Sequence, residues 1–259
     1  MSAKILCLDL ETAPITAHVW GLRDQNIGLN QIMSHPRVIG IAAKWIDARG
    51  VSWKSEYHDS RTEMLEWAHD LLDQADIMVS YNGQGFDAPW LYSEFAKEDI
   101  HPPSPFRHVD LYRVARKLRL PSYKLAYVSQ HLGIGAKIDT GGHDLWTRCL
   151  ERTGDEQRKA WSDMRKYAKQ DVALLPPLFY KLRPYFPANV NLAVYDPAND
   201  GVLTCQKCER SEHLMRRGFA YTAQRAYPQH YCDPAKGGCG GWTRDTKASW
   251  AVPAAGVTR

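Results

Sequence analysis

The chain has 259 residues, 44% of them hydrophobic and 24% charged, which is ordinary for a globular protein with one sizeable domain and a smaller one. No apolar run approaches the roughly 18 residues of a membrane span, and Asp9 interrupts the apolar stretch where a secretion signal would need its centre. Composition therefore argues against an integral membrane protein. We expect a cytoplasmic, intracellular protein with no membrane partner.

The formal charge of +4 is distributed unevenly along the chain. Residues 201–259 contain nine Lys or Arg against four Asp or Glu, a net charge of +5, whereas the preceding residues sum to −1. A basic appendage on a nearly neutral body fits a polyanionic partner such as nucleic acid. Basic tails are also common as ordinary solvated surface, so the charge alone does not choose between the two.

The spacing of apolar residues predicts an α/β domain over residues 1–187. Three strands are expected first, followed by helices that alternate with shorter strands, and this order places a sheet against helices. The expected strands are 3–10, 37–46, 51–58, 76–83 and 107–109. The expected helices are 60–75, 86–98, 110–118, 122–133 and 155–175. Ser60 and Glu63 form a capping box for the first helix, and Pro176 and Pro177 are expected to interrupt or kink the last.

Changes in composition mark the expected domain boundaries. The α/β domain should end at residue 187, and 188–203 should form a linker because they are rich in Pro and Asn and lack periodicity. Residues 204–250 hold four of the six cysteines and an expected hairpin, and they form a small separate module. Residues 251–259 are expected to be a disordered tail.

Acidic residues occur in three stretches of the α/β domain. Asp9 and Glu11 are two apart on the first expected strand and therefore share one face. Asp87 follows a glycine-containing turn and opens a helix, where its side chain can face the end of the sheet. Tyr167 and Asp171 are four apart on the last expected helix and share a face. Burying unpaired carboxylates is costly, so acids on a buried strand predict cations nearby.

Each of these features also has an ordinary structural explanation. Asp87 could be a helix N-cap, and Tyr167 with Asp171 could be a partly exposed helical pair. Asp9 and Glu11 are harder to explain in that way. The occurrence of all of them on a strand, a turn and a late helix, in this order, favours a site for metal ions.

The stretches DLET, NGQGFD and YAKQD resemble the three exonuclease motifs of the DEDD superfamily, whose fold is that of ribonuclease H and which includes proofreading domains of DNA polymerases. The resemblance covers residues 1–187 and implies a ribonuclease H-like mixed five-stranded sheet flanked by helices. It further implies that two Mg²⁺ or Mn²⁺ ions are held by four catalytic acids, namely Asp9, Glu11, Asp87 and Asp171.

The same resemblance implies roles for residues beside the acids. One subclass has a histidine five residues before the last acid, where this chain has Lys166, whereas Tyr167 matches the tyrosine that orients the attacking water in the other subclass. Thr12, Asn82 and Phe86 are implied to bind the terminal nucleotide, although Phe86 could equally be a core residue. Oxygen ligands suit both ions, and a pair of such ions can activate water for phosphoryl transfer.

The cysteines Cys205, Cys208, Cys232 and Cys239 resemble a zinc ribbon in which the second pair has an enlarged spacing. Four thiolates suit one structural Zn²⁺ ion, and His230 or His213 could replace one of them. The module could simply stabilise the tail or contact another protein. The arginines and aromatic residues between its cysteines favour contact with nucleic acid.

These features predict a 3′-to-5′ exonuclease that hydrolyses DNA by a two-metal mechanism, with single-stranded DNA or a DNA 3′ end as its partner. An exoribonuclease and a structure-specific endonuclease on the same fold are the alternative enzymes. A non-catalytic module that binds nucleic acid or protein is the alternative from another class. A replication or recombination protein is a further expected type of partner.

Overall fold

The computed structural model describes residues 3–135, 142–187 and 189–251, which form two compact units. The larger unit contains residues 4–116 and 120–178, and the smaller contains 1–3, 117–119 and the residues from 179 onward. The boundaries predicted at residues 187, 203 and 250 stay predictions, and the expected disordered tail lies, after Ala251, outside the described residues. Within these ranges, no helix combines the length and the apolar character needed to cross a bilayer.

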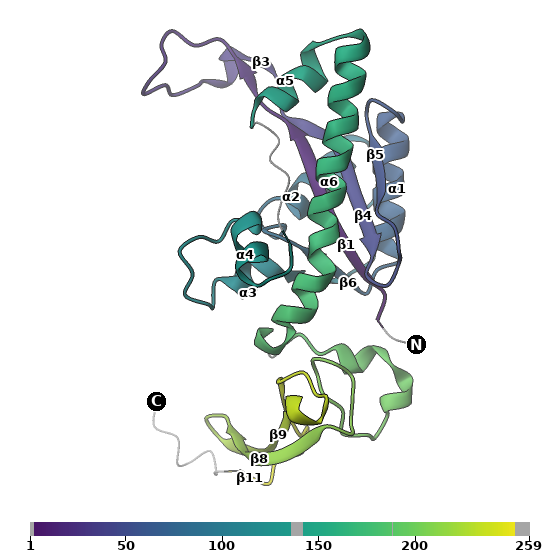
Figure 1. The fold of residues 1–259 in the computed structure, drawn as a ribbon, viewed down its shortest axis with the longest axis vertical. Helices are drawn as coiled ribbons and strands as arrows, with labels where there is room; N and C mark the ends of the chain where they lie inside the picture. Colours follow the sequence, from purple (N-terminus) through teal and green to yellow (C-terminus); the bar gives the residue numbers. More distant parts are fainter. Residues whose placement is uncertain (1–2, 136–141, 188, 252–259) are drawn as a thin grey trace. The chain divides into compact units, whose positions relative to one another are not determined.

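A mixed sheet of five strands forms the centre of the larger unit (Figure 1). Its order is β5-β4-β1-β6-β7, in which β1 pairs antiparallel with β4 and parallel with β6. The strands are β1 (Ile5–Ala13), β4 (Arg37–Trp45), β5 (Ser52–Ser55), β6 (Ile77–Ser80) and β7 (Arg107–Asp110). The predicted mixed five-stranded sheet is confirmed. The third predicted strand is shorter than expected, because the chain turns away after Ser55.

Two features that the apolar spacing did not predict also belong to this unit. The strands β2 (Thr16–Ala17) and β3 (Ile32–Ser34) pair as a short antiparallel ribbon. The helix α5 (Asp144–Glu151) buries Leu145 and Cys149, which are one helical turn apart. That spacing, with the ion pair between Asp144 and Arg148, is the signal that could have revealed the helix.

The remaining helices of the larger unit agree with the sequence prediction. They are α1 (Arg61–Asp73), α2 (Asp87–Lys97), α3 (Leu111–Ala115), α4 (Leu125–His131) and α6 (Gly154–Leu182). The capping box of α1 is confirmed, because the Glu63 N–H donates to Ser60 Oγ at 3.1 Å and the Ser60 N–H donates to Glu63 Oε2 at 2.9 Å.

The helix α6 continues through Pro176 and Pro177 without a break. The predicted interruption at these prolines is therefore wrong, whereas the predicted kink stays a prediction. Each proline removes one helical hydrogen bond, at a cost of about 3 kcal/mol. Buried side chains before and after the prolines offset that cost, since they keep the helix packed on both sides of the defect. They include Val172, Leu175, Leu178 and Phe179.

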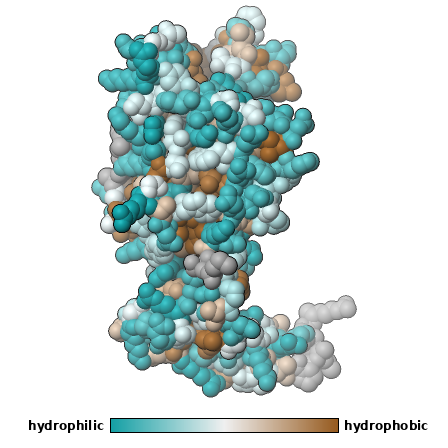
Figure 2. Space-filling model, turned by 90° about the vertical axis from the view of Figure 1, so that its right-hand side faces the viewer, coloured by the Kyte–Doolittle hydropathy of each residue, from teal (hydrophilic) through white to brown (hydrophobic). Residues whose placement is uncertain are grey.

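The core of the larger unit lies on both faces of the sheet. Leu6, Leu8 and Leu10 of β1 pack in one cluster with buried residues of α1 and α2. Ala13 of β1 and Ile39 of β4 pack in another cluster with residues of α5 and α6. Accordingly, α6 crosses one face of the strands in Figure 1. Figure 2 shows one side of the molecule, on which hydrophobic residues are interspersed among hydrophilic ones.

The smaller unit contains a second sheet built around β9. The strands are β8 (Leu214–Tyr221), β9 (Arg225–Cys232), β10 (Trp242–Arg244) and β11 (Trp250–Ala251). β9 pairs antiparallel with each of the other three. The predicted hairpin is thus confirmed as β8 and β9. Short 3-10 turns complete the unit, and they are η2 (Arg183–Tyr185), η3 (Leu192–Tyr195), η4 (Pro197–Asn199) and η5 (Pro234–Lys236).

Candidate active site

Asp9 and Glu11 project from β1 toward the side of the sheet covered by α6. Leu8 and Leu10 pack on the opposite side with α1 and α2, and Ala13, which shares the face of the acids, packs with residues of α5 and α6. Glu11 is only 5% exposed. The two acids therefore lie on the face where α6 can contribute further polar groups.

The pairing of β1 with β4 is irregular beside Glu11. Glu11 pairs with Gly40 of β4, whereas Thr12 pairs with Val38, so β4 has one extra residue at this point. A Cβ atom on Gly40 would lie 2.2 Å from the Trp53 ring, so any side chain there would displace the ring. Bulges bend a strand locally and redirect its side chains, and they are common next to active sites.

Asp87 is hydrogen-bonded to the backbone of β1 at Leu10, between Asp9 and Glu11. Its Oδ1 accepts a hydrogen bond from the Leu10 N–H at 3.0 Å, although 77 positions separate the two residues in the sequence. Phe86 holds the N-cap position of α2, and Asp87 is the first residue of the helix, so the N-cap alternative is wrong. Burial raises the pKa of the Asp87 carboxyl to about 7. The negative charge of Asp110 also raises this pKa, whereas the hydrogen bond from Leu10 lowers it. A cation beside this carboxyl would favour its charged form.

Asp110 holds the turn that leads into Asp87. Its carboxylate accepts the backbone N–H of Asn82 at 2.8 Å and of Gln84 at 3.2 Å. It also accepts the Tyr112 N–H at 3.0 Å, and Asp110 is thus the N-cap of α3. Asn82 has a φ of 70°, a left-handed conformation that asparagine tolerates better than most residues. The sequence did not indicate this second role of Asp110.

Gly83 and Ser80 pack tightly inside the same turn. A Cβ atom on Gly83 would lie 2.2 Å from Ser80 Oγ and 2.7 Å from Asp87 Oδ2, so any side chain would displace the acid or the serine. Ser80 Oγ lies in turn 2.7 Å from His108 Nε2. Burial lowers the pKa of His108 to about 4, so the ring is neutral at neutral pH. The turn that leads into Asp87 is therefore held by Ser80, which accepts the Gly83 N–H at 3.2 Å, and by the Asp110 carboxylate.

Tyr167 and Asp171 lie one turn apart on α6. Asp171 is 4% exposed, which is unusual for a carboxylate. Tyr167 packs at the edge of the cluster that contains Trp161, and its ring meets that of Trp146 at 6.1 Å with an interplanar angle of 77°. The tyrosine is thus held by α5 as well as by its own helix.

A cavity of about 410 Å³ opens beside Glu11. Its lining residues are Leu10, Glu11, Thr12, Pro14, Phe86, His143 and Trp146. Thr12 and Phe86, two of the residues predicted to bind substrate, meet here, and Phe86 is 38% exposed and so is not simple core. The third, Asn82, lies in the turn held by Asp110. His143 and Trp146 were missed by the sequence prediction, because α5 was missed.

The four acids Asp9, Glu11, Asp87 and Asp171 do not form a closed metal-binding cage. Across residues 3–135, 142–187 and 189–251, the cysteines are the only group of three or more His, Cys, Asp or Glu residues whose ligand atoms lie within 4.8 Å of one another. Mg²⁺ is usually bound by one or two carboxylates, with waters and substrate phosphates completing its coordination. The oxygen donors of the four acids suit such an open site in their chemistry.

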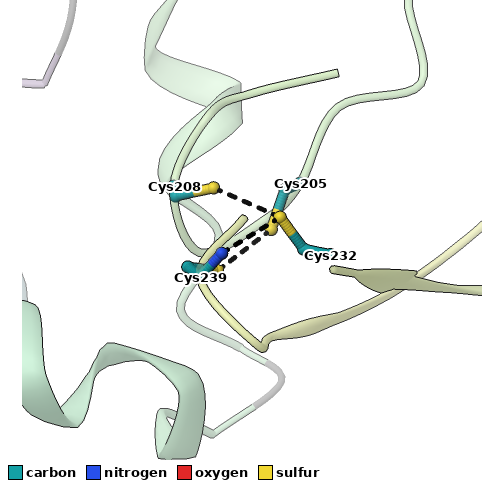
Figure 3. Close-up of side chains that lie close together, drawn as sticks. All are labelled: Cys205, Cys208, Cys232 and Cys239. Carbon is teal, nitrogen blue, oxygen red and sulfur yellow. Dashed lines mark hydrogen bonds between the residues drawn. The ribbon is translucent and has the colours of Figure 1, made fainter. Parts of the chain in front are cut away.

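The four cysteines of the smaller unit point toward one another, as Figure 3 shows. The Sγ atoms of Cys205 and Cys239 are 3.6 Å apart, as are those of Cys208 and Cys232. Four thiolates about 2.3 Å from a central zinc ion would be about 3.8 Å apart in a tetrahedron, so the cluster fits Zn²⁺. Hydrogen bonds among the thiols lower the pKa of Cys205 and raise the pKa values of Cys208 and Cys239, because one thiolate accepts from its protonated neighbours.

The two histidines considered as alternative ligands have other neighbours. His213 lies 3.6 Å from Glu212, and His230 lies 3.0 Å from Asp245. The cysteine cluster itself receives backbone hydrogen bonds, from the Cys239 N–H to Cys232 Sγ at 3.3 Å and from the Gly241 N–H to Cys239 Sγ at 3.3 Å. Donors of this kind orient thiolate ligands.

Comparison with known proteins places the chain in a family. Residues 27–183 match RNase_H_2, described as RNase_H superfamily, and because this is more than half of the chain, the protein belongs to the RNase H superfamily. The matched region includes Asp87, Tyr167 and Asp171 but begins after the strand that carries Asp9 and Glu11. The RNase H-like α/β fold predicted from the sequence is thus confirmed.

One similar solved structure is the family B DNA polymerase from the hyperthermophilic archaeon Pyrobaculum calidifontis. The similarity has 17% sequence identity and a TM-score of 0.49, and it covers 71% of this chain. It covers 25% of the polymerase, so this chain spans about a quarter of that protein. No curated protein matches the sequence.

Proposed function

We propose that the protein is a metal-dependent 3′-to-5′ exonuclease of the DEDD tyrosine subclass that hydrolyses single-stranded DNA or DNA 3′ ends. Membership of the RNase H superfamily supports nuclease chemistry in general. The observation that carries the proposal is the hydrogen bond from Leu10 to Asp87, which brings the buried carboxylate of Asp87 to β1 between Asp9 and Glu11. A module that only binds nucleic acid has no use for acids gathered near a polyanion, because they repel the phosphates.

The proposed site assigns one task to each group of side chains. Asp9, Glu11, Asp87 and Asp171 would hold two Mg²⁺ or Mn²⁺ ions, which when bound supply an activated water and stabilise the leaving oxygen. Tyr167 would orient the water by a hydrogen bond, since a phenol with a pKa near 10 is a poor base at neutral pH. Thr12 and Phe86 would contact the terminal nucleotide in the cavity beside Glu11, with Asn82 in the adjoining turn.

The smaller unit would hold one structural Zn²⁺ through its four cysteines. Thiolate ligands persist in a reducing compartment, and we therefore place the protein inside the cell. The basic smaller unit and the nuclease site would both contact nucleic acid. We propose a replication or recombination protein as the protein partner.

Digestion of end-labelled substrates tests the proposed function. Linear single-stranded DNA, linear duplex DNA, circular single-stranded DNA and RNA should each be incubated with Mg²⁺, with Mn²⁺ and without either ion. We expect mononucleotides to be released from the 3′ end of linear DNA only when a divalent ion is present. Cleavage of the circle would instead identify an endonuclease, and faster loss of RNA would identify an exoribonuclease. Complete absence of cleavage would identify a binding module and overturn the proposal.

Replacing Tyr167 with phenylalanine should separate binding from turnover. Tyr167→Phe removes one hydroxyl and leaves every acid in place, so DNA binding should stay near the wild-type value while hydrolysis slows by about 10- to 1000-fold. Single-turnover rates and melting temperature should be measured on the same preparation. Tyr180→Phe, on the same helix and 44% exposed, is the matched control and should keep full activity. A lower melting temperature with an unchanged rate would show that Tyr167 is structural.

A further inference from the structure

One side of the sheet in the smaller unit collects aromatic and basic residues. Side chains alternate along β9, so Tyr227, Gln229 and Tyr231 lie on one side while Ala226 and Cys232 are buried on the other. In β10, Trp242 pairs with Tyr231 and Arg244 pairs with Gln229. Paired residues of adjacent strands point to the same side, so the tryptophan and this arginine join the two tyrosines.

Arginines lie over the tyrosines of this surface. The guanidinium of Arg244 is 4.2 Å from the ring centroid of Tyr227, and that of Arg217 is 5.5 Å from the centroid of Tyr231. Trp242 is 42% exposed, and its ring centroid is 5.0 Å from that of Tyr231. These five residues, Arg217, Tyr227, Tyr231, Trp242 and Arg244, are called the Arg–Tyr face below.

Charge around the Arg–Tyr face favours a polyanion. Residues 204–251 contain eight Lys or Arg against four Asp or Glu. The acid nearest in sequence, Asp245, lies 3.0 Å from His230, which alternates to the opposite side of β9. Asp233 caps η5 by accepting the Ala235 N–H at 3.1 Å, and Glu212 lies beside His213. These three acids thus contact groups outside the Arg–Tyr face, and both arginines of the face are exposed.

We propose that the Arg–Tyr face binds single-stranded nucleic acid. Aromatic rings can stack on unpaired bases of any sequence, and arginines can contact the phosphates between them. Bases inside a duplex are already stacked on one another, so this face should prefer single strands. The surface is a second contact for the proposed nuclease, and its binding does not depend on the catalytic acids.

The adjacent Arg216 provides an internal control. Its guanidinium lies 5.4 Å from the ring centroid of Phe219, so it makes the same kind of cation–π contact as Arg217. Arg216 pairs with His230 and Phe219 pairs with Pro228, which places both on the side of the sheet opposite the Arg–Tyr face. Replacing Arg216 changes the net charge as much as replacing Arg217 does, but on the other side of the sheet.

Binding measurements on the full chain test this proposal. Fluorescence anisotropy should be recorded with a labelled oligothymidylate and with a duplex of the same length, at fixed salt and without added Mg²⁺ or Mn²⁺, so that the strand stays intact. We expect Arg217→Gln alone to raise the Kd for the single strand by about 3- to 5-fold. Arg217→Gln combined with Arg244→Gln, and separately Trp242→Ala, should raise it by about 10-fold. Arg216→Gln should raise it by less than about 2-fold. Unchanged zinc content and circular dichroism would confirm that each variant is folded.

Two results would overturn the proposal. An equal loss of affinity in Arg216→Gln and Arg217→Gln would mean that only net charge matters, and normal affinity in all variants would mean that the face serves another partner, such as a protein. Hydrolysis of thymidine 5′-p-nitrophenyl phosphate, which offers no adjoining strand, tests the nuclease separately and should be normal in these variants. If neither the wild type nor any variant cleaves this substrate, the nuclease proposal fails. If the face variants still lose affinity for the single strand in that case, the proposed binding role of the Arg–Tyr face holds.

Discussion

Changing Asp9 to alanine, or Asp171 to asparagine, should reduce DNA hydrolysis by at least about 1000-fold while leaving the fold intact. Both acids are proposed ligands of the paired metal ions, and the loss of either would disturb the geometry that activates the water. Asp9 is only partly buried on β1, so alanine removes charge without opening the core. Activity should be measured under single-turnover conditions, with circular dichroism and melting temperature recorded on the same samples.

Asp155→Asn is the matched control for these variants. Its side chain is 92% exposed near the start of α6, the helix that also carries Asp171, so its rate should equal that of the wild type. A folded Asp9→Ala protein that cleaves at the wild-type rate would refute the assignment of the acids. An equal loss in Asp155→Asn would point to a general electrostatic effect on DNA binding.

Changing Cys205 and Cys208 together to serine should remove the bound zinc and unfold the smaller unit. Freshly purified wild-type protein is expected to contain about one zinc ion per chain, because four Sγ atoms within 4.8 Å suit a closed tetrahedral site. Structural zinc sites contribute about 10–16 kcal/mol of apparent binding free energy, which is also folding free energy. Elemental analysis would measure the zinc, and the loss of a cooperative thermal transition would report the unfolding.

Two further proteins complete the zinc experiment. Cys149→Ser changes a buried cysteine of the larger unit that lies outside the cluster, and this variant should retain its zinc. Asp9→Ala should retain it as well, because the catalytic acids and the cysteines form separate sites. Wild-type protein without zinc, or zinc that disappears with Asp9, would contradict the cysteine assignment.

Local patterns in the sequence predicted most of the secondary structure. Alternation along β1 predicted that Asp9 and Glu11 share one face, and the positions of Ser60 and Glu63 predicted the start of α1. These features depend on contacts between residues a few positions apart, which the sequence determines directly. α5 was missed, so the sequence did not indicate that His143 and Trp146 line the cavity beside Glu11.

The sequence by itself determined which residues are candidates for the two metal sites. It did so through the order of the three acidic stretches and the spacing of the cysteines. Only the tertiary structure decided how they are held. The Leu10 N–H reaches Asp87 across 77 positions, and Asp110 holds the turn at Asn82 from 28 positions away. Such contacts depend on which strands pair and in what register, and apolar spacing along one segment carries no information about its distant partners. Packing on both sides of Pro176 and Pro177 likewise outweighs a local tendency to break α6.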